Sequence, residues 1–293
     1  MAIEMDLTEA LVSLIRQAST TLPSDHMAAL QAAAEQEPAG SLARETFELM
    51  IQNAQTAAET STPTCQDTGT LLFYVDHGPE YRQAELRERI AAAARTATHR
   101  SYLRPNAVCS RTGKNSGDNT GTGAPYIHFE EKDGPGIFVK LMLKGGGSEN
   151  MGRQYTVPDS RIGAGRDLKG VRKCVIDSVF QAQGYGCAPG IIGVGVGGDR
   201  MSSFLTSKEA LFRRVDDEHE DPEIAALEKQ LIGECNQLRI GPMGFGGDTT
   251  VLGVKIGFRH RVPASYFVSI SYMCWANRKA YLTYQDGTAE ITQ

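Results

Sequence analysis

The chain has 293 residues, of which 41% are hydrophobic and 22% charged, and 30 Lys and Arg against 35 Asp and Glu leave a formal charge of −5. This composition is that of a globular protein rather than a disordered chain, and so mild a charge argues against nucleic acid as the main partner. No apolar run approaches the roughly 18 residues that a membrane-spanning helix needs. The N-terminus is acidic and amphipathic, unlike a secretion signal. We expect a cytoplasmic protein without a membrane partner.

The first hundred residues are mostly helical by pattern. Ala-, Leu-, Glu- and Arg-rich stretches with apolar residues three or four apart predict helices over 7–18, 41–59 and 81–98. A loop bracketed by Pro63 and Gly69 leads into a strand at 71–75. Pro, Gly, Asn, Ser and Thr then dominate 101–125, which predicts a long functional loop.

The second half alternates between strand and helix patterns. A helix is expected at 169–183, and another at 222–237 with Asp221 as N-cap and Pro222 as its first residue. Apolar stretches predict strands at 126–130, 137–143, 191–198, 250–256 and 265–271. We therefore expect a mixed α/β (α+β) fold, in which a mainly helical lead-in (1–60) precedes a mixed β-sheet flanked by helices. No composition break divides the chain, so residues 1–293 are expected to form one domain with its functional loops at strand ends.

The six cysteines show no CxxC pair, so they are interpreted by position, which leaves the role of Cys109 open and assigns the other five. Cys174 and Cys235 lie inside helical patterns, where a thiol is usually part of the core. Cys65, Cys187 and Cys274 each lie at the boundary of a predicted element, where a thiolate can project into a cleft. They are either buried loop cysteines or, if they converge, a metal site, and three thiolates suit an iron–sulfur cluster better than a structural zinc.

Ten of the 31 glycines lie in runs at 145–147, 193–198 and 244–247. Such runs either allow close packing and tight turns or let backbone N–H groups approach an anion. The middle run is not a dinucleotide-binding fingerprint, because no helix opens at its second glycine. Two charged groups stand in the other loops: Asp67 follows Cys65 closely, and Arg104 offers the planar fork that binds carboxylates.

Six motifs in order make the sequence resemble the alpha subunit, or N-terminal half, of the iron–sulfur hydro-lyases, namely class I fumarate hydratase and L(+)-tartrate dehydratase. The motifs are PTCQDTGTLLFYV (63–75), LRPNAV with NSGDNTG (103–121), LKGGGSEN (143–150), QGYGCAPGIIGVGVGGDR (183–200), IGPMGFGGDTTVLGVKIG (240–257) and PASYFVSISYMCWANRK (263–279). They contain all three boundary cysteines.

The resemblance implies a [4Fe-4S] cluster held by Cys65, Cys187 and Cys274, with one iron lacking a protein ligand. It also implies substrate contacts from Gln66, Asp67, Arg104 and the triple glycine at Gly146 or Gly147, with Asp67 in the acid–base chemistry. One position departs from the family, because the His of many relatives is Val262 here. Either His260 substitutes for it, or Asp67 and a partner residue move the proton.

The resemblance favours reversible hydration of fumarate to (S)-malate, with L(+)-tartrate dehydration as the alternative and related C4–C5 diacids not excluded. A dianionic substrate needs more cationic groups than these motifs supply, so we expect a beta-type subunit or domain and a homo-oligomer of the pair. A cluster-free module that binds an anion through its glycines is the competing hypothesis.

Overall fold

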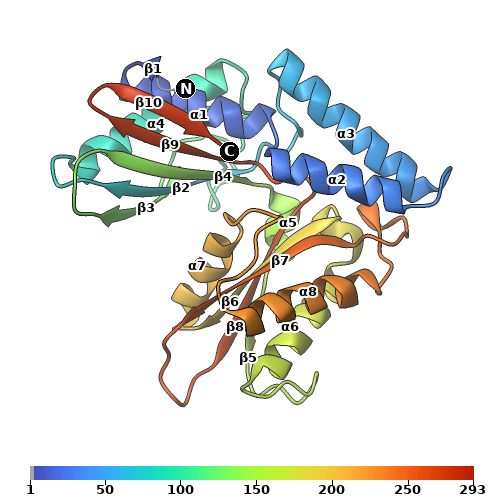
Figure 1. Cartoon of the computed structure of the whole chain (residues 1–293). Helices are drawn as coiled ribbons and strands as arrows, with labels where there is room; N and C mark the ends of the chain where they lie inside the picture. Colours follow the sequence, from blue (N-terminus) through green and yellow to red (C-terminus); the bar gives the residue numbers. More distant parts are fainter. Residues whose placement is uncertain (1–2) are drawn as a thin grey trace. The chain divides into compact units, whose positions relative to one another are not determined.

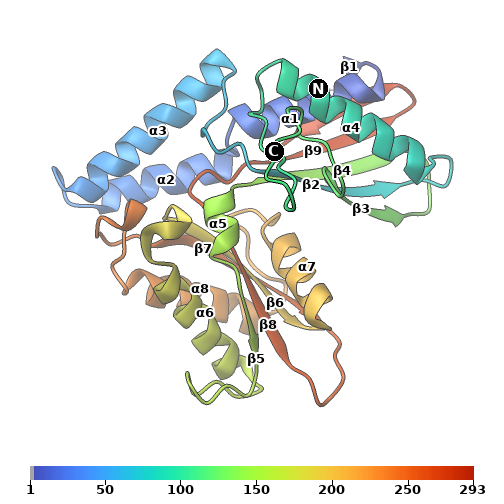
Figure 2. The same ribbon diagram turned by 180° about the vertical axis from the view of Figure 1, so that it is seen from behind.

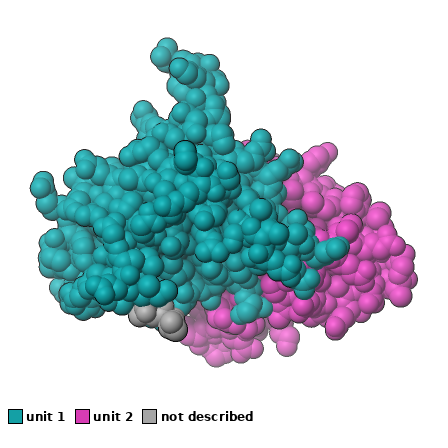
Figure 3. Space-filling model, turned by 90° about the horizontal axis from the view of Figure 1, so that it is seen from above, with its two compact units in different colours: residues 1–24, 52–146, 278–293 teal, residues 25–51, 147–277 magenta. Residues whose placement is uncertain are grey.

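The structure is a computed structural model that describes residues 3–293. The chain forms two compact units, and each is assembled from separated stretches (Figure 3). The first unit contains the stretches up to Ser24, Gln52–Gly146 and Arg278–Gln293, and the second contains Asp25–Ile51 and Gly147–Asn277. Because the stretches alternate along the sequence, no single composition break marks the units. That the whole chain acts as one domain stays a prediction.

The first unit is built on a six-stranded sheet in the order β1-β10-β9-β4-β2-β3. Neighbouring strands are antiparallel except β2 and β3, which are parallel. Helices α1 and α4 pack against each other, and α1 lies on β4, β9 and β10 (Figures 1 and 2). The bounds are β1 Ile3–Glu4, α1 Leu7–Thr20, β2 Thr70–His77, α4 Gln83–His99, β3 Tyr126–Glu131, β4 Ile137–Lys144, β9 Lys279–Gln285 and β10 Thr288–Thr292.

The core of this unit explains the helical pattern at the N-terminus. Leu11, Leu14 and Ile15 of α1 are at most 1% exposed and pack with Phe73 of β2 and Leu141 of β4. Residues 101–125 contain no helix or regular strand, as predicted. The long loop therefore starts where α4 ends and returns to the sheet at β3.

The second unit is built on a four-stranded sheet in the order β5-β8-β6-β7, in which β6 and β7 are parallel. Helix α7 packs on one side of β6, β7 and β8, and α6 and α8 lie on the other side (Figures 1 and 2). The bounds are α2 Ser24–Gln36, α5 Gly146–Asn150, β5 Arg153–Thr156, α6 Leu168–Ala182, η1 Gln183–Gly186, β6 Gly190–Gly197, α7 Arg200–Ala210, α8 Pro222–Asn236, η2 Pro242–Gly244, β7 Val251–Arg259 and β8 Phe267–Met273. Helix α3, Leu42–Thr60, contributes residues to both units.

The glycines of β6 determine how α7 packs. A Cβ on Gly193 would lie 2.0 Å from the Ser207 carbonyl oxygen, and one on Gly195 would lie 2.0 Å from that of Ser203. The alternate residues Ile192, Val194 and Val196 face the core formed with α6 and α8. The glycine run of β6 is thus a packing surface for a helix, the close-packing alternative of the sequence analysis.

The mixed α/β fold is confirmed, and most predicted elements are found within three residues of their expected ends. Asp221 caps α8 through a bond from the Glu223 N–H, with Pro222 at the first position as predicted. Among residues 3–293, no helix is long and apolar enough to cross a membrane.

Candidate functional site

The loop between α3 and β2 carries Cys65, Gln66 and Asp67. Thr64 anchors its start, because the buried threonine donates from both N and Oγ1 to the Ser19 carbonyl, at 2.9 and 3.0 Å. Its own carbonyl accepts from Asn53 Nδ2 at 2.7 Å. Cys65 follows this fixed point and is partly exposed. The loop therefore presents its thiol from a rigid base.

The Asp67 carboxylate is held by two backbone donors. Its Oδ1 accepts from the Gly69 N–H at 3.0 Å, and its Oδ2 accepts from the Gly146 N–H at 2.7 Å. Gly69 has φ +78°, and a Cβ there would lie 2.7 Å from the Lys144 main chain, so only glycine fits this turn. A carboxylate offers about four acceptor positions. Two remain for a proton or a ligand.

Arg104 lies against the same loop. Its Nη1 donates to the Gln66 carbonyl at 3.1 Å, and its N–H donates to Thr68 Oγ1 at 3.1 Å. The side chain is exposed, as is that of Gln66. The structure thus brings Gln66, Asp67 and Arg104 together on an exposed part of the loop, where a guanidinium can bind a carboxylate.

Two asparagines that the sequence analysis did not single out hold the Arg104 segment. Asn119 is buried with φ +63°, its Nδ2 donates to the Arg104 carbonyl at 2.8 Å, and its Oδ1 accepts from the Asn106 N–H at 2.8 Å. Asn106 in turn donates to Thr68 Oγ1 at 2.9 Å. Both lie in the motifs LRPNAV and NSGDNTG. The preference of Asn for positive φ was the available signal.

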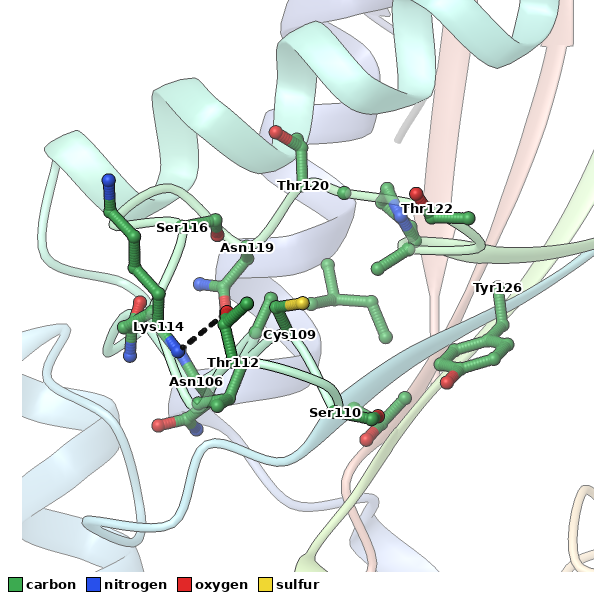
Figure 4. Close-up of a pocket in the computed structure, with 18 of the residues that line it drawn as sticks. Asn106, Cys109, Ser110, Thr112, Lys114, Ser116, Asn119, Thr120, Thr122 and Tyr126 are labelled. Atoms are coloured by element: carbon green, nitrogen blue, oxygen red, sulfur yellow. Dashed lines mark hydrogen bonds between the residues drawn. The ribbon is translucent and has the colours of Figure 1, made fainter.

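A cavity of about 830 Å³ opens beside these asparagines, framed by the long loop 106–126 and by residues 69–71 (Figure 4). Its lining is rich in hydroxyl and amide groups and includes the cationic residues Arg111 and Lys114. Cys109 also lines it, and a hydrogen bond from Thr112 holds the pKa of this exposed thiol below its usual value. The cavity belongs to the first unit alone.

In the second unit, Cys187 and Cys274 come to the same edge of the sheet. Cys187 lies just before β6 in the left-handed region (φ 57°, ψ 62°), and Cys274 directly follows β8. Strand register pairs Ile191 with Met273, and the Trp275 N–H donates to the Cys187 carbonyl at 3.0 Å. The two cysteines therefore occupy adjoining strand ends, as their boundary positions in the sequence suggested.

The two cysteines that lie inside helices are core residues, as predicted. Cys174 in α6 and Cys235 in α8 are fully buried, and burial raises the pKa of each thiol to about 12. Such thiols stay protonated at neutral pH, whereas iron is bound by thiolates. They serve as small apolar residues of the core of the second unit.

His260 does not lie near this edge. It follows β7, whose last residue Arg259 pairs with Gly197 at the far end of β6, whereas Cys187 precedes Gly190 at the near end. At about 3.3 Å per residue, the length of β6 separates the two ends by roughly 23 Å. His260 and Val262 are both exposed. The structure therefore does not bring His260 together with Cys187 and Cys274.

The triple glycine divides between the two units. The N–H of Gly146 is used by Asp67 in the first unit, and Gly147 lies in the second, where a Cβ would be 3.5 Å from the Tyr185 carbonyl. Likewise Cys65 belongs to the first unit, and Cys187 and Cys274 belong to the second. Among residues 3–293, no three His, Cys, Asp or Glu side chains gather into a ready-made metal site.

Comparison of the sequence with known proteins identifies the family of the chain. The model described as Fumarate hydratase (Fumerase) matches residues 8–283. The chain belongs to this family. A Geobacillus stearothermophilus protein with the provisional name fumarate hydratase class I is 45% identical over 288 residues, which are 97% of this chain and 56% of that relative. The chain thus spans little more than half the length of that fumarate hydratase relative.

Two further relatives of this fumarate hydratase family member are named as subunits. A Methanocaldococcus jannaschii protein with the provisional name L(+)-tartrate dehydratase subunit alpha is 34% identical over 281 residues, 94% of this chain and 96% of the relative. The L(+)-tartrate dehydratase subunit alpha of Escherichia coli K12 is 31% identical over 278 residues, 94% of this chain and 90% of the relative. The chain has nearly the length of these alpha subunits.

Proposed function

We propose that the chain is the alpha-type part of an iron–sulfur hydro-lyase that hydrates fumarate reversibly to (S)-malate. The observation that carries the proposal is the loop in which Cys65, Gln66 and Asp67 stand consecutively against Arg104 in a member of the fumarate hydratase family. The Geobacillus relative, at 45% identity, is named for fumarate hydratase. Its name favours fumarate as the substrate.

We propose that Cys65, Cys187 and Cys274 hold a [4Fe-4S] cluster. The donor set fits: Cys65 and Cys187 are partly exposed, and all three cysteines lie outside the helices and strands, unlike the fully buried helical thiols. When bound, the cluster supplies a Lewis acid, because an iron without a protein ligand leaves a coordination position open. A cluster of this kind is best preserved in a reducing compartment, which supports a cytoplasmic location.

The residues around the Cys65–Asp67 loop have separate proposed roles in binding the substrate and moving a proton. Arg104 binds a substrate carboxylate through its outward-facing donors, and Gln66 adds a neutral polar contact. Asp67, oriented by two N–H donors, exchanges a proton with the hydroxyl that is added or lost. Gly146 serves by holding Asp67, and Gly147 is proposed as a backbone contact for substrate. His260 is left out, because it stands at the other end of its sheet from Cys187 and Cys274.

The same residues suit L(+)-tartrate, which also presents a carboxylate and an α-hydroxyl. The specific observation in favour of this alternative is sequence identity, because two relatives named as L(+)-tartrate dehydratase alpha subunits are 34% and 31% identical to this chain over 94% of its residues. Under either substrate we propose a beta-type partner that supplies further cationic groups and the base that acts on carbon. We expect the pair to form a symmetric oligomer.

The test is anaerobic reconstitution of the chain with iron and sulfide, followed by assays of fumarate, mesaconate and L(+)-tartrate with and without a beta-type protein. We expect a brown protein with broad absorption near 400 nm, and turnover of fumarate that depends on the partner. Turnover of tartrate alone would select the alternative. A colourless, inactive chain that still binds dicarboxylate anions would support a cluster-free binding module instead.

A further inference from the structure

Arg278 is a buried cation that the proposed chemistry does not use. It begins the last stretch of the first unit, just before β9, and its side chain is 1% exposed. Its Nη1 donates to the Asp67 carbonyl oxygen at 2.5 Å. Its Nε is buried without a hydrogen-bond partner anywhere in residues 3–293.

Such a side chain works against stability. A guanidinium removed from water costs free energy unless its donors are paired, and an unpaired buried N–H adds to that cost. A smaller apolar residue would fill the position with less penalty. The contact with Asp67 is therefore the feature that needs this arginine.

Arg278 and its neighbours contact both the main chain and the side-chain carboxylate of Asp67. The Arg278 carbonyl accepts from the Leu143 N–H at 3.0 Å, which ties it to the end of β4. Three residues further on, the Gly146 N–H binds the Asp67 carboxylate. A Cβ on Gly145 would lie 3.0 Å from Asp67 Oδ2 and 3.4 Å from Arg278 Nη2. The end of β4 thus positions Asp67 in two ways. Arg278, bonded to Leu143, holds the Asp67 main chain, and Gly146 holds the Asp67 carboxylate.

Arg104 and Arg278 hold successive carbonyls of the same dipeptide. Arg104 binds that of Gln66 and is exposed, and Arg278 binds that of Asp67 and is buried. The exposed arginine can turn toward a ligand without freeing the segment, because the buried one keeps the Asp67 peptide in place. The two guanidinium groups therefore have different tasks.

We propose that Arg278 is a positioning residue, which fixes the Asp67 peptide so that the carboxylate stays between the N–H groups of Gly69 and Gly146. The inference rests on the proposed function for its catalytic consequence, but not for its geometry. Arg278 also follows Cys274 by four residues in the sequence. The segment that carries a proposed cluster ligand thereby also carries the residue that orients the proposed acid–base group.

The first test needs neither iron nor activity. Amide hydrogen exchange of the purified chain should show the Gly69 and Gly146 amides exchanging roughly tenfold faster or more in Arg278→Gln, and less so in Arg278→Lys, which keeps a long cationic donor. Arg100→Lys, an exposed substitution in the same unit, should change neither amide. If Arg278→Gln does not fold, the lysine variant carries the measurement. Unchanged exchange at both amides, or equal acceleration throughout the chain, would overturn the proposal.

The second test uses the reconstituted enzyme with its beta-type partner. For Arg278→Gln, kcat should fall roughly tenfold to a hundredfold while KM changes less than about threefold, with iron content unchanged. Added guanidinium should restore part of kcat in Arg278→Ala, because it refills the buried position. Loss of iron in parallel with activity, or failure of rescue, would make Arg278 a structural residue only. If the wild-type enzyme neither hydrates fumarate nor dehydrates L(+)-tartrate, the proposed function fails. The hydrogen-exchange result then tests the positioning role of Arg278 independently.

Discussion

The glycines at the end of β4 and those of β6 look alike in the sequence but serve different physical purposes. In β6, Gly193 and Gly195 leave out a side chain so that the backbone of α7 can approach the strand. At the end of β4, Gly145 leaves out a side chain so that the Asp67 carboxylate can approach the N–H of Gly146. The first arrangement packs a helix on a sheet, and the second positions the Asp67 carboxylate. Substitutions should separate the two.

The largest effect is expected from Gly195→Ala. The new Cβ would meet the Ser203 carbonyl oxygen at 2.0 Å, and neither backbone can move without disturbing the packing of α7 on the sheet. We expect a loss of about 3 kcal/mol or more in the free energy of unfolding, measured by chemical denaturation. The matched control is Gly233→Ala in α8, which meets no atom within 4 Å and should stabilise the chain by up to about 1 kcal/mol. Equal losses in both variants would contradict the packing explanation.

Asp67→Asn should abolish most turnover without unfolding the protein. The amide cannot accept hydrogen bonds through both of its terminal atoms, so either the Gly69 or the Gly146 N–H loses its acceptor, and no carboxylate remains to exchange a proton. We expect kcat to fall about a hundredfold or more, with iron content unchanged. Asp133→Asn, in an exposed turn, is the control. Simultaneous loss of iron would show that Asp67 is structural.

Arg104→Lys should weaken transition-state binding while the fold is kept. Lysine lacks the planar fork, so kcat/KM should fall roughly tenfold to a hundredfold, which corresponds to about 1–3 kcal/mol. Steady-state kinetics with the partner present provide the measurement. Unchanged kinetics would mean that the arginine is surface charge.

Gly145→Ala should have the smallest effect on activity and stability. It is also the most informative variant for the comparison between the glycines of β6 and those at the end of β4. Its Cβ would lie 3.0 Å from the Asp67 carboxylate, which is a side chain and can shift. We expect roughly a tenfold fall in kcat with less than about 1 kcal/mol lost in stability. If the variant does not fold, Gly145 is needed for packing of the fold, like the glycines of β6.

Local patterns predicted those parts of the fold that local physics decides. Asp221 and Pro222 begin α8 as expected, because a side-chain cap and a fixed φ act within a few residues. The helix Arg200–Ala210 was missed, because its serines and threonine lower helix propensity. It begins with a capping box between Asp199 and Ser202 and is stabilised by packing on β6.

The site was predictable in its residues but not in its connections. Gln66, Asp67 and Arg104 came from motifs, and the structure does place them together. The partner of Asp67 at Arg278 is separated from it by 211 positions, so no spacing rule reaches it. His260 was a candidate because it is the histidine nearest to Val262, where many relatives have a His, and only strand register shows that it lies a full strand length from Cys187 and Cys274.

The interleaving of the two units has a consequence for synthesis of the protein. Strand β9 lies between β4 and β10 in the first sheet, yet it is translated after the whole second unit. On the ribosome, all residues of the second unit are synthesised before the first sheet can close, and the Asp67 loop lacks its contact with Arg278 until that residue emerges. During this interval Cys65 is attached to an incomplete sheet with an unpaired β4 edge, the state in which chains aggregate or lose thiols to oxidation. Insertion of the proposed cluster is then best timed after release of the chain, and expression at a slow rate under low oxygen should raise the yield of folded protein.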